Sequence, residues 1–225
     1  LITCLVVITL GCVSYAEILI VGKDRSAGYN SIQDAINAAS DGDEIIVMPG
    51  TYTTSGPGPS IPVINMLGKA IWLHSSDGPE NTVLDGVNAR RLVMCTQGET
   101  NDTVIEGFTL TRGNPYWGGT SYGGGVNCYN ASPTFINCVI SNNYATYGGG
   151  VCVEEGNARF YDCQFLNNTG HEKGGCVFHP GNGLFENCVF ENNYTNYYGG
   201  GMYGGSVIKN CIFKNNSVMG GTYST

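Results

Sequence analysis

A repeat of about 25 residues is the feature that most limits how this chain can fold. Four segments align residue for residue: each begins with Phe or Ile, carries Cys three positions later and ends in Asn-Asn, over 135–143, 160–168, 185–193 and 208–216. The steps between them are 25, 25 and 23 residues. Repeats of this length are typical of solenoids, in which a single repeat cannot bury its own apolar face and must stack on its neighbours.

Equivalent positions of the repeat form columns of similar side chains. The four columns are Phe135, Phe160, Phe185 and Ile208; Cys138, Cys163, Cys188 and Cys211; Ile140, Phe165, Phe190 and Phe213; and Asn143, Asn168, Asn193 and Asn216. If each coil makes one circuit, equivalent residues stack about 4.8 Å apart. We expect these asparagines to take the left-handed conformation at a corner and to hydrogen-bond along their column.

The segments between the repeats predict short strands and tight turns. Glycine pairs or triplets separate the short apolar stretches, as at Gly150-Val151 and Gly201-Met202. Leucine-rich repeats share the period, but they need a regular leucine pattern that this chain lacks. The phrases Phe-x-x-Cys-x-Phe-x-Asn-Asn and Gly-Gly-Gly-Val resemble the right-handed parallel β-helix (pectin-lyase-like) superfamily, especially the repeats of polymorphic outer-membrane proteins and secreted β-helix proteins. The resemblance covers about residues 17–225 and implies an all-β, right-handed parallel β-helix solenoid.

The N-terminal part has features of a leader and of a cap. Residues 1–16 form a short apolar run that ends in a small-x-small site, which predicts an incomplete signal peptide cleaved before Glu17. A buried first strand and a lipoprotein anchor at Cys12 are the alternatives. Residues 30–39 start like a capping box and carry an apolar face, so we expect a short helix that caps the solenoid.

We expect residues 17–225 to form one domain, with regular coils from about residue 103. The chain stops at Thr225 soon after another Gly-Gly, with no second cap, so we expect the array to continue beyond it.

Charge and cysteine content limit the kinds of site that the chain can carry. A net charge of -8, with ten scattered cations, argues against nucleic acid as a partner. The apolar run at the start is too short for a membrane span, so we predict none. The Cys138 column is expected to be a buried stack of free thiols, with disulfides as the alternative in a secreted chain. No zinc-like spacing of Cys and His is present, so we predict no metal and no cofactor.

Two features are candidates for binding a ligand. If Val126, Val151, Val177 and Met202 point inward, the residues after them point outward and form an exposed lengthwise stripe of Asn127, Cys152, Phe178 and Tyr203. Aromatic faces stack on sugar rings, and in the enzymes that this chain resembles the corresponding sheet carries the substrate groove. The loop 112–122 adds Arg112, Tyr116, Trp117 and Tyr122, a set that suits a glycan. Ordinary surface aromatics and a loop that covers a coil edge are the alternatives, and His179 is expected in the core.

The resemblance also implies which catalytic groups an enzyme of this superfamily would need. Its lyases use clustered Asp ligands for calcium with an Arg or Lys base, and its hydrolases use closely spaced Asp residues. From Asn127 onward the chain has one aspartate, Asp162, and its adjacent acidic pair Glu154-Glu155 should face opposite sides of a strand. Earlier aspartates, including Asp85, are interpreted as turn residues.

The sequence therefore predicts a secreted or cell-surface, non-catalytic β-helix with a polysaccharide-binding, adhesive or structural role. A polysaccharide lyase or glycoside hydrolase with its catalytic residues beyond Thr225, and the passenger of an autotransporter, are the alternatives.

Overall fold

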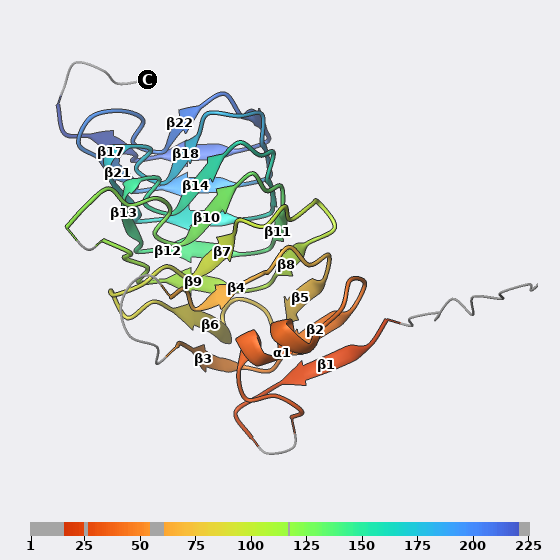
Figure 1. The fold of residues 1–225 in the computed structure, drawn as a ribbon. Coiled ribbons are helices and arrows are strands. Elements are labelled where there is room, and N and C mark those ends of the chain that lie inside the picture. The colour runs from red at the N-terminus through yellow and green to blue at the C-terminus, as the bar shows by residue number, and fades with distance from the viewer. Residues whose placement is uncertain (1–15, 25–26, 55–60, 117, 221–225) are drawn as a thin grey trace, which may run out of the picture.

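The computed structural model describes residues 16–24, 27–54, 61–116 and 118–220. These residues wind into a solenoid of short strands that rises from the N-terminal end, red in Figure 1, to the blue end of the chain. Neighbouring coils pair through parallel strands, from β1 with β2 at one end to β20 with β24 at the other. This architecture confirms the predicted all-β solenoid. Residues 1–15 of the predicted signal peptide, among them the alternative anchor at Cys12, and Thr225 lie outside the described residues.

The strands stack into four parallel sheets, within which each strand pairs with the next one named. The eight-stranded sheet contains β1 (Ile18–Val21), β2 (Glu44–Val47), β5 (Trp72–Ser75), β8 (Val104–Glu106), β11 (Thr134–Ile136), β15 (Arg159–Tyr161), β19 (Leu184–Glu186) and β23 (Val207–Lys209). The six-stranded sheet contains β4 (Ile64–Asn65), β7 (Val93–Cys95), β10 (Val126–Tyr129), β14 (Val151–Glu154), β18 (Val177–His179) and β22 (Met202–Gly204).

The other two sheets complete the circuit. The seven-stranded sheet contains β3 (Gly50–Tyr52), β6 (Thr82–Asp85), β9 (Thr109–Thr111), β12 (Val139–Ser141), β16 (Gln164–Leu166), β20 (Val189–Glu191) and β24 (Ile212–Lys214). The four-stranded sheet contains β13 (Tyr144–Tyr147), β17 (Thr169–Lys173), β21 (Tyr194–Thr195) and β25 (Ser217–Val218).

Aromatic side chains from successive coils stack inside the solenoid. The ring centroids of Phe135 and Phe160 lie 5.0 Å apart, and those of Phe160 and Phe185 lie 4.7 Å apart, with the ring planes within 7° of parallel. In a second stack, the ring centroids of Phe165 and Phe190 lie 4.6 Å apart. These rings are fully buried, so the predicted apolar columns form the core of the later coils up to Phe190. Their last members, Ile208 and Phe213, are exposed.

The asparagine column joins the coils by side-chain hydrogen bonds. The Oδ1 atom of Asn168 accepts from the backbone N–H and the Nδ2 of Asn143, both at 3.1 Å, and its Nδ2 donates to the carbonyl of Ile140 at 2.8 Å. The expected left-handed conformation at these positions is wrong. It belongs to the preceding residue of each pair, with φ near +55° at Asn142, Asn167, Asn192 and Asn215. The first asparagine therefore turns the chain, and the second bridges the coils and is buried except in the last pair, where Asn216 is half-buried.

The cysteines of the repeat are free and point inward. Cys138, Cys163 and Cys188 are buried, and all eight described cysteines are unpaired. The thiol of Cys163 lies 3.2 Å from the carbonyl oxygen of Tyr161, and burial raises the pKa of this thiol. The interpretation as a stack of buried free thiols is therefore confirmed for these three cysteines, whereas Cys211, the last of the column, is free but half-buried.

A short helix, α1 (Ile32–Ala38), lies at the N-terminal end of the solenoid in contact with β1, β2 and β4 (Figure 1). Its N-cap residue Ser31 accepts a hydrogen bond from the Asp34 N–H, and its apolar face is buried. At the other end of the helix, Lys69 Nζ donates to the carbonyls of Ile36, Asn37 and Ala39 at 2.6–2.9 Å. The predicted capping helix is confirmed. In the described part of the chain, no helix is long and apolar enough to cross a membrane.

Candidate functional site

The strand that follows each glycine cluster carries the predicted outward column. Asn127, Cys152, Phe178 and Tyr203 are in register on β10, β14, β18 and β22. The three valines before the first three of them are buried, and Met202 before Tyr203 is half-buried against the core. Asn127, Phe178 and Tyr203 are half-buried. The expectation of a continuous exposed stripe is wrong at Cys152, which is fully buried although it is in register with outward residues.

Aromatic side chains form a continuous ladder along this side of the molecule. Tyr122 stacks on Tyr147 with the ring centres 5.3 Å apart, and the rings of Tyr147 and Phe178 are in contact with their centres 5.2 Å apart. Phe178 in turn stacks on Tyr203, with a distance of 5.7 Å between the ring centres. Tyr198 lies 6.2 Å from Tyr203. We call these five residues the aromatic ladder. Cys152 contributes no ring in its coil. Tyr147 lies in the same coil and fills this gap, because its ring contacts both Tyr122 in the preceding coil and Phe178 in the following one.

The ladder combines two columns that the backbone brings side by side. Tyr122, Tyr147, Lys173 and Tyr198 each directly precede a glycine with positive φ, and they pair with one another across the coils. A Cβ atom at Gly123 or Gly148 would overlap the carbonyl of Val126 or Val151, so the tight turn requires glycine. The sequence reasoning missed Tyr147, Lys173 and Tyr198. Their shared place directly before each glycine cluster is the signal that would have revealed them.

Charged groups flank the ladder. The Lys173 ammonium lies 5.0 Å from the ring centre of Tyr203 and 5.9 Å from that of Tyr198. The Tyr147 hydroxyl donates a hydrogen bond to Glu172, which raises the pKa of Tyr147 to about 12. Burial, together with the neighbouring Glu155, also raises the pKa of Glu154. The tyrosine edges are therefore set among carboxylates, with one lysine over the last rings.

A shallow hollow of about 290 Å³ adjoins the end of the ladder. It is lined by His171, Glu172, Lys173, Tyr197 and Tyr198. At the other end of the ladder, the guanidinium of Arg91 donates to the carbonyls of Tyr122 and Gly123 at 2.6–3.2 Å. Arg91 thereby fixes the turn that positions Tyr122.

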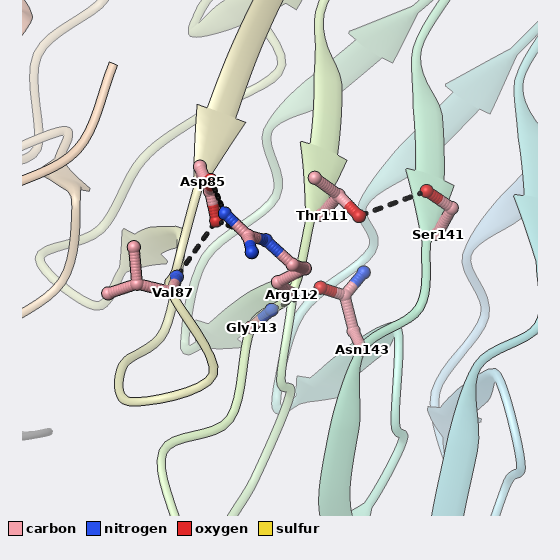
Figure 2. Close-up of polar contacts among 7 residues, drawn as sticks. All are labelled: Asp85, Val87, Thr111, Arg112, Gly113, Ser141 and Asn143. Atoms are coloured by element: carbon pink, nitrogen blue, oxygen red, sulfur yellow. Dashed lines mark hydrogen bonds and ion pairs between the residues drawn. The ribbon is translucent and has the colours of Figure 1, made fainter. Parts of the chain in front are cut away.

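The structure places Arg112 in a different network, shown in Figure 2. Arg112 lies directly after β9 and forms an ion pair with Asp85 at the end of β6. The same carboxylate accepts from the N–H of Val87 at 2.9 Å, as a turn residue does. Burial opposes ionisation of Asp85, but the hydrogen bonds and the charge of Arg112 outweigh it and lower the pKa of Asp85. The Arg112 guanidinium therefore joins two neighbouring coils instead of facing the ladder.

The remaining predicted residues of the loop also separate. Tyr116 is 49% exposed and makes an edge contact with Tyr144, whose ring centre is 6.2 Å away. Trp117 lies outside the described residues. Of the predicted binding residues, the structure thus brings Tyr122, Phe178 and Tyr203 into one ladder and leaves Arg112 and Tyr116 apart from it.

Two further predictions concern buried or clustered polar groups. His179 lies in the core, as expected, where its Nδ1 accepts from the Gly181 N–H at 3.1 Å and burial lowers the pKa of the ring. Within the described ranges, no group of three or more His, Cys, Asp or Glu side chains is arranged to hold a metal ion.

Comparison with known proteins agrees with the coil architecture. A family model described as the right handed beta helix region matches residues 68–225, whereas no curated protein matches the chain. Among solved structures, two of pectin methylesterase, one of them a point mutant and each in complex with a hexasaccharide, superpose with a TM-score of 0.57 at 16% identity. The aligned part covers 87% of this chain but only 66% of the pectin methylesterase chain, and at this identity the likeness concerns the fold alone. The chain belongs to the family of right-handed parallel β-helix proteins, with a pectin-lyase-like fold.

Proposed function

We propose that this chain is a secreted or cell-surface, non-catalytic β-helix that binds polysaccharide along its aromatic ladder. The observation that carries the proposal is the unbroken contact of five aromatic rings over four successive coils. A row of rings along a rigid axis suits an extended polymer better than a compact ligand, because each coil offers one more equivalent contact.

The way in which the rings stack defines the kind of contact. Phe178 and Tyr203 lie within 9° of parallel and cover each other's faces, and Tyr122 and Tyr147 lie within 19°. Tyrosine edges and hydroxyls are therefore what a ligand would meet over most of the ladder. These hydroxyls are donors and acceptors at the end of an apolar body, the combination that favours sugar hydroxyls and sugar C–H groups together.

Charge favours a neutral polysaccharide. Glu154 and Glu172 flank the rings, Lys173 provides one positive charge, and the Arg91 guanidinium is occupied by backbone carbonyls. The chain as a whole carries a net charge of -8. A polyanionic glycan would be repelled by this surface, whereas a neutral glycan would find hydrogen-bond acceptors beside the ladder.

Depletion of purified chain beginning at Glu17 by insoluble or gel-embedded polysaccharides tests this proposal. We expect binding to a neutral polysaccharide, weakened about tenfold by Tyr203→Ala and about threefold by Tyr147→Phe, which keeps the ring and removes only the hydroxyl. Tyr116→Ala is the matched control, because Tyr116 is exposed but lies apart from the ladder.

Equal binding by all four proteins, or no binding to any neutral polysaccharide, would contradict the proposal. Release of shortened or chemically altered sugar during the same incubation would instead assign the chain to the polysaccharide-cleaving enzymes, the alternative function for this fold.

A further inference from the structure

A second aromatic surface lies on a different sheet, near the capped end of the solenoid. Trp72 on β5 points outward from the eight-stranded sheet and is 42% exposed. The aromatic ladder lies on and directly beside the six- and four-stranded sheets of the later coils, so the two surfaces share no residue (Figure 1). Exposed aromatic side chains are common on protein surfaces, and Trp72 differs from most of them because its position is fixed.

Two contacts hold the Trp72 ring in place, and a third holds the side chain on which it stacks. Its Nε1 donates to a carboxylate oxygen of Glu106, on the next coil, at 2.9 Å. One face of the ring stacks on His74, with the ring centres 4.2 Å apart and the planes 25° from parallel. His74 is in turn held by Glu44, on the preceding coil, through its Nε2 at 2.8 Å. The indole is therefore a rigid platform, which reduces the entropy that a ligand would have to overcome on binding.

The charge around this platform is negative. Glu44 is paired with His74, but the hydrogen bond that Glu106 accepts from Trp72 comes from a neutral donor. The strands β1, β2, β5, β8 and β11, which surround the platform, contain no lysine or arginine. Arg159 on β15 is the first cation of this sheet beyond them. An unbalanced carboxylate beside an aromatic ring attracts a positively charged group both by its charge and by the electrons of the ring face.

We propose that Trp72 and Glu106 form a binding site for a protonated amino sugar within a cationic glycan. The apolar face of the sugar ring lies on the free surface of the indole, and its ammonium group pairs with the Glu106 carboxylate. A rigid sugar ring suits this flat platform better than a flexible lysine side chain, because less conformational entropy is lost when it binds. This site is independent of the function proposed for the aromatic ladder.

Tryptophan fluorescence tests the proposal directly in the full chain. The sequence contains two tryptophans, so Trp117→Phe leaves Trp72 as the single reporter. The probes are a fully deacetylated glucosamine oligomer and the N-acetylated oligomer of equal length, at mildly acidic pH where the free amine is charged. We expect both to quench Trp72, with the deacetylated oligomer binding about fivefold more tightly.

Glu106→Gln gives the sharpest control. The amide oxygen can still accept the indole hydrogen bond, so the platform stays in place while its charge is removed. We expect this variant to lose the preference for the deacetylated oligomer and to bind the acetylated one unchanged, whereas Trp72→Ala weakens both about tenfold by calorimetry. Tyr116→Ala, which changes an exposed ring outside both the platform and the aromatic ladder, should leave the quenching of Trp72 by both oligomers unchanged.

The proposal is overturned by equal affinity for the two oligomers, by a preference that survives Glu106→Gln, or by absence of binding to either. Tighter binding of a lysine oligopeptide than of the deacetylated oligomer would also overturn it, because the surface would then select a basic peptide. A melting curve of each variant establishes that it is folded, and Glu106→Gln keeps the test valid even if Trp72→Ala unfolds.

Discussion

The early and late coils of this solenoid are built in different ways. In the eight-stranded sheet, one inward residue of each coil pairs with its equivalent in the next: Leu19, Ile45, Leu73, Ile105 and Phe135. The sequence separations between these successive partners are 26, 28, 32 and 30 residues. From Phe135 onward, the steps to Phe160, Phe185 and Ile208 are 25, 25 and 23. Coils of unequal length cannot place the same side chain at the same corner, so only the late coils carry ladders of Phe and Asn.

The two regions therefore hold their coils together by different contacts. The late coils repeat one set of stacked rings and amide bonds at every step. The early coils use contacts that each occur once, such as Lys69 on the end of α1 and Arg112 on Asp85. A change in a ladder should consequently weaken two neighbouring interfaces, and a change in an early contact should act locally.

Asn168→Ala should produce the largest loss of stability. It removes the acceptor of the buried Asn143 N–H and the donor of the Ile140 carbonyl, so we expect a fall of about 3 kcal/mol in the free energy of unfolding. Urea denaturation measures it. Asn167→Gly is the matched control, because Asn167 is exposed with φ +55° and glycine accepts that conformation, so its effect should stay below about 0.5 kcal/mol. Similar losses in the two variants would contradict the separate roles of each Asn pair.

Lys69→Met should have a smaller and local effect. Methionine keeps the apolar stem, but the carbonyls of Ile36, Asn37 and Ala39 lose a charged donor, at an expected cost of about 2 kcal/mol. Hydrogen exchange should show loss of protection in α1 and β1, with the late coils unchanged. Equal loss throughout the solenoid would mean that the early and late coils unfold as one unit.

His179→Val sharpens the comparison within the late coils. Val153 follows Cys152 as His179 follows Phe178, so this variant copies the residue of the preceding coil. Nε2 of His179 has no hydrogen-bond partner among the described residues, and burial lowers the pKa of the ring. The native state then binds fewer protons than the unfolded state, and stability should fall as the pH drops below about 6.5, by at most about 1.4 kcal/mol per pH unit.

The valine variant should lose this part of the pH dependence. Melting curves from neutral to mildly acidic pH measure the difference between the two proteins. If the stability of the wild type stays constant over this pH range, or if it changes with pH equally in both proteins, His179 is not the source of the pH dependence.

Asp85→Asn should have the smallest effect, below about 1 kcal/mol, because Arg112 is half exposed. The lowered pKa of Asp85 means that its stabilisation is complete above the unfolded value of about 3.9 and is lost as the pH falls through the native value. The wild type should therefore be more stable than the variant at neutral pH, and the difference should vanish in acid. A difference that persists in strong acid would assign the effect to packing instead of charge.

The sequence predicts most of what the repeat controls. The Phe and Cys columns and the inward Val residues follow from the period, because equal spacing fixes which side chains meet. The capping helix follows instead from the capping-box start and the apolar face of residues 30–39. It does not predict which member of Asn142-Asn143 turns the chain, since both tolerate the left-handed conformation and a shift of one residue separates them. Tyr147 and Tyr198 were missed because glycine turns bring them beside the strand that follows. Arg112 and Asp85 are 27 residues apart on irregular coils, and no periodicity connects them.

The constant spacing of Asn143, Asn168 and Asn193 has a consequence for how such a protein changes over generations. An unequal exchange between two copies of the gene, aligned at neighbouring Asn-Asn pairs, would add or remove one whole coil. The chain on either side would rejoin with its rings and amides facing the same partners as before. The late coils can thus change in number without any new contact having to arise, whereas a similar exchange among the unequal early coils would separate Lys69 or Arg112 from its partner.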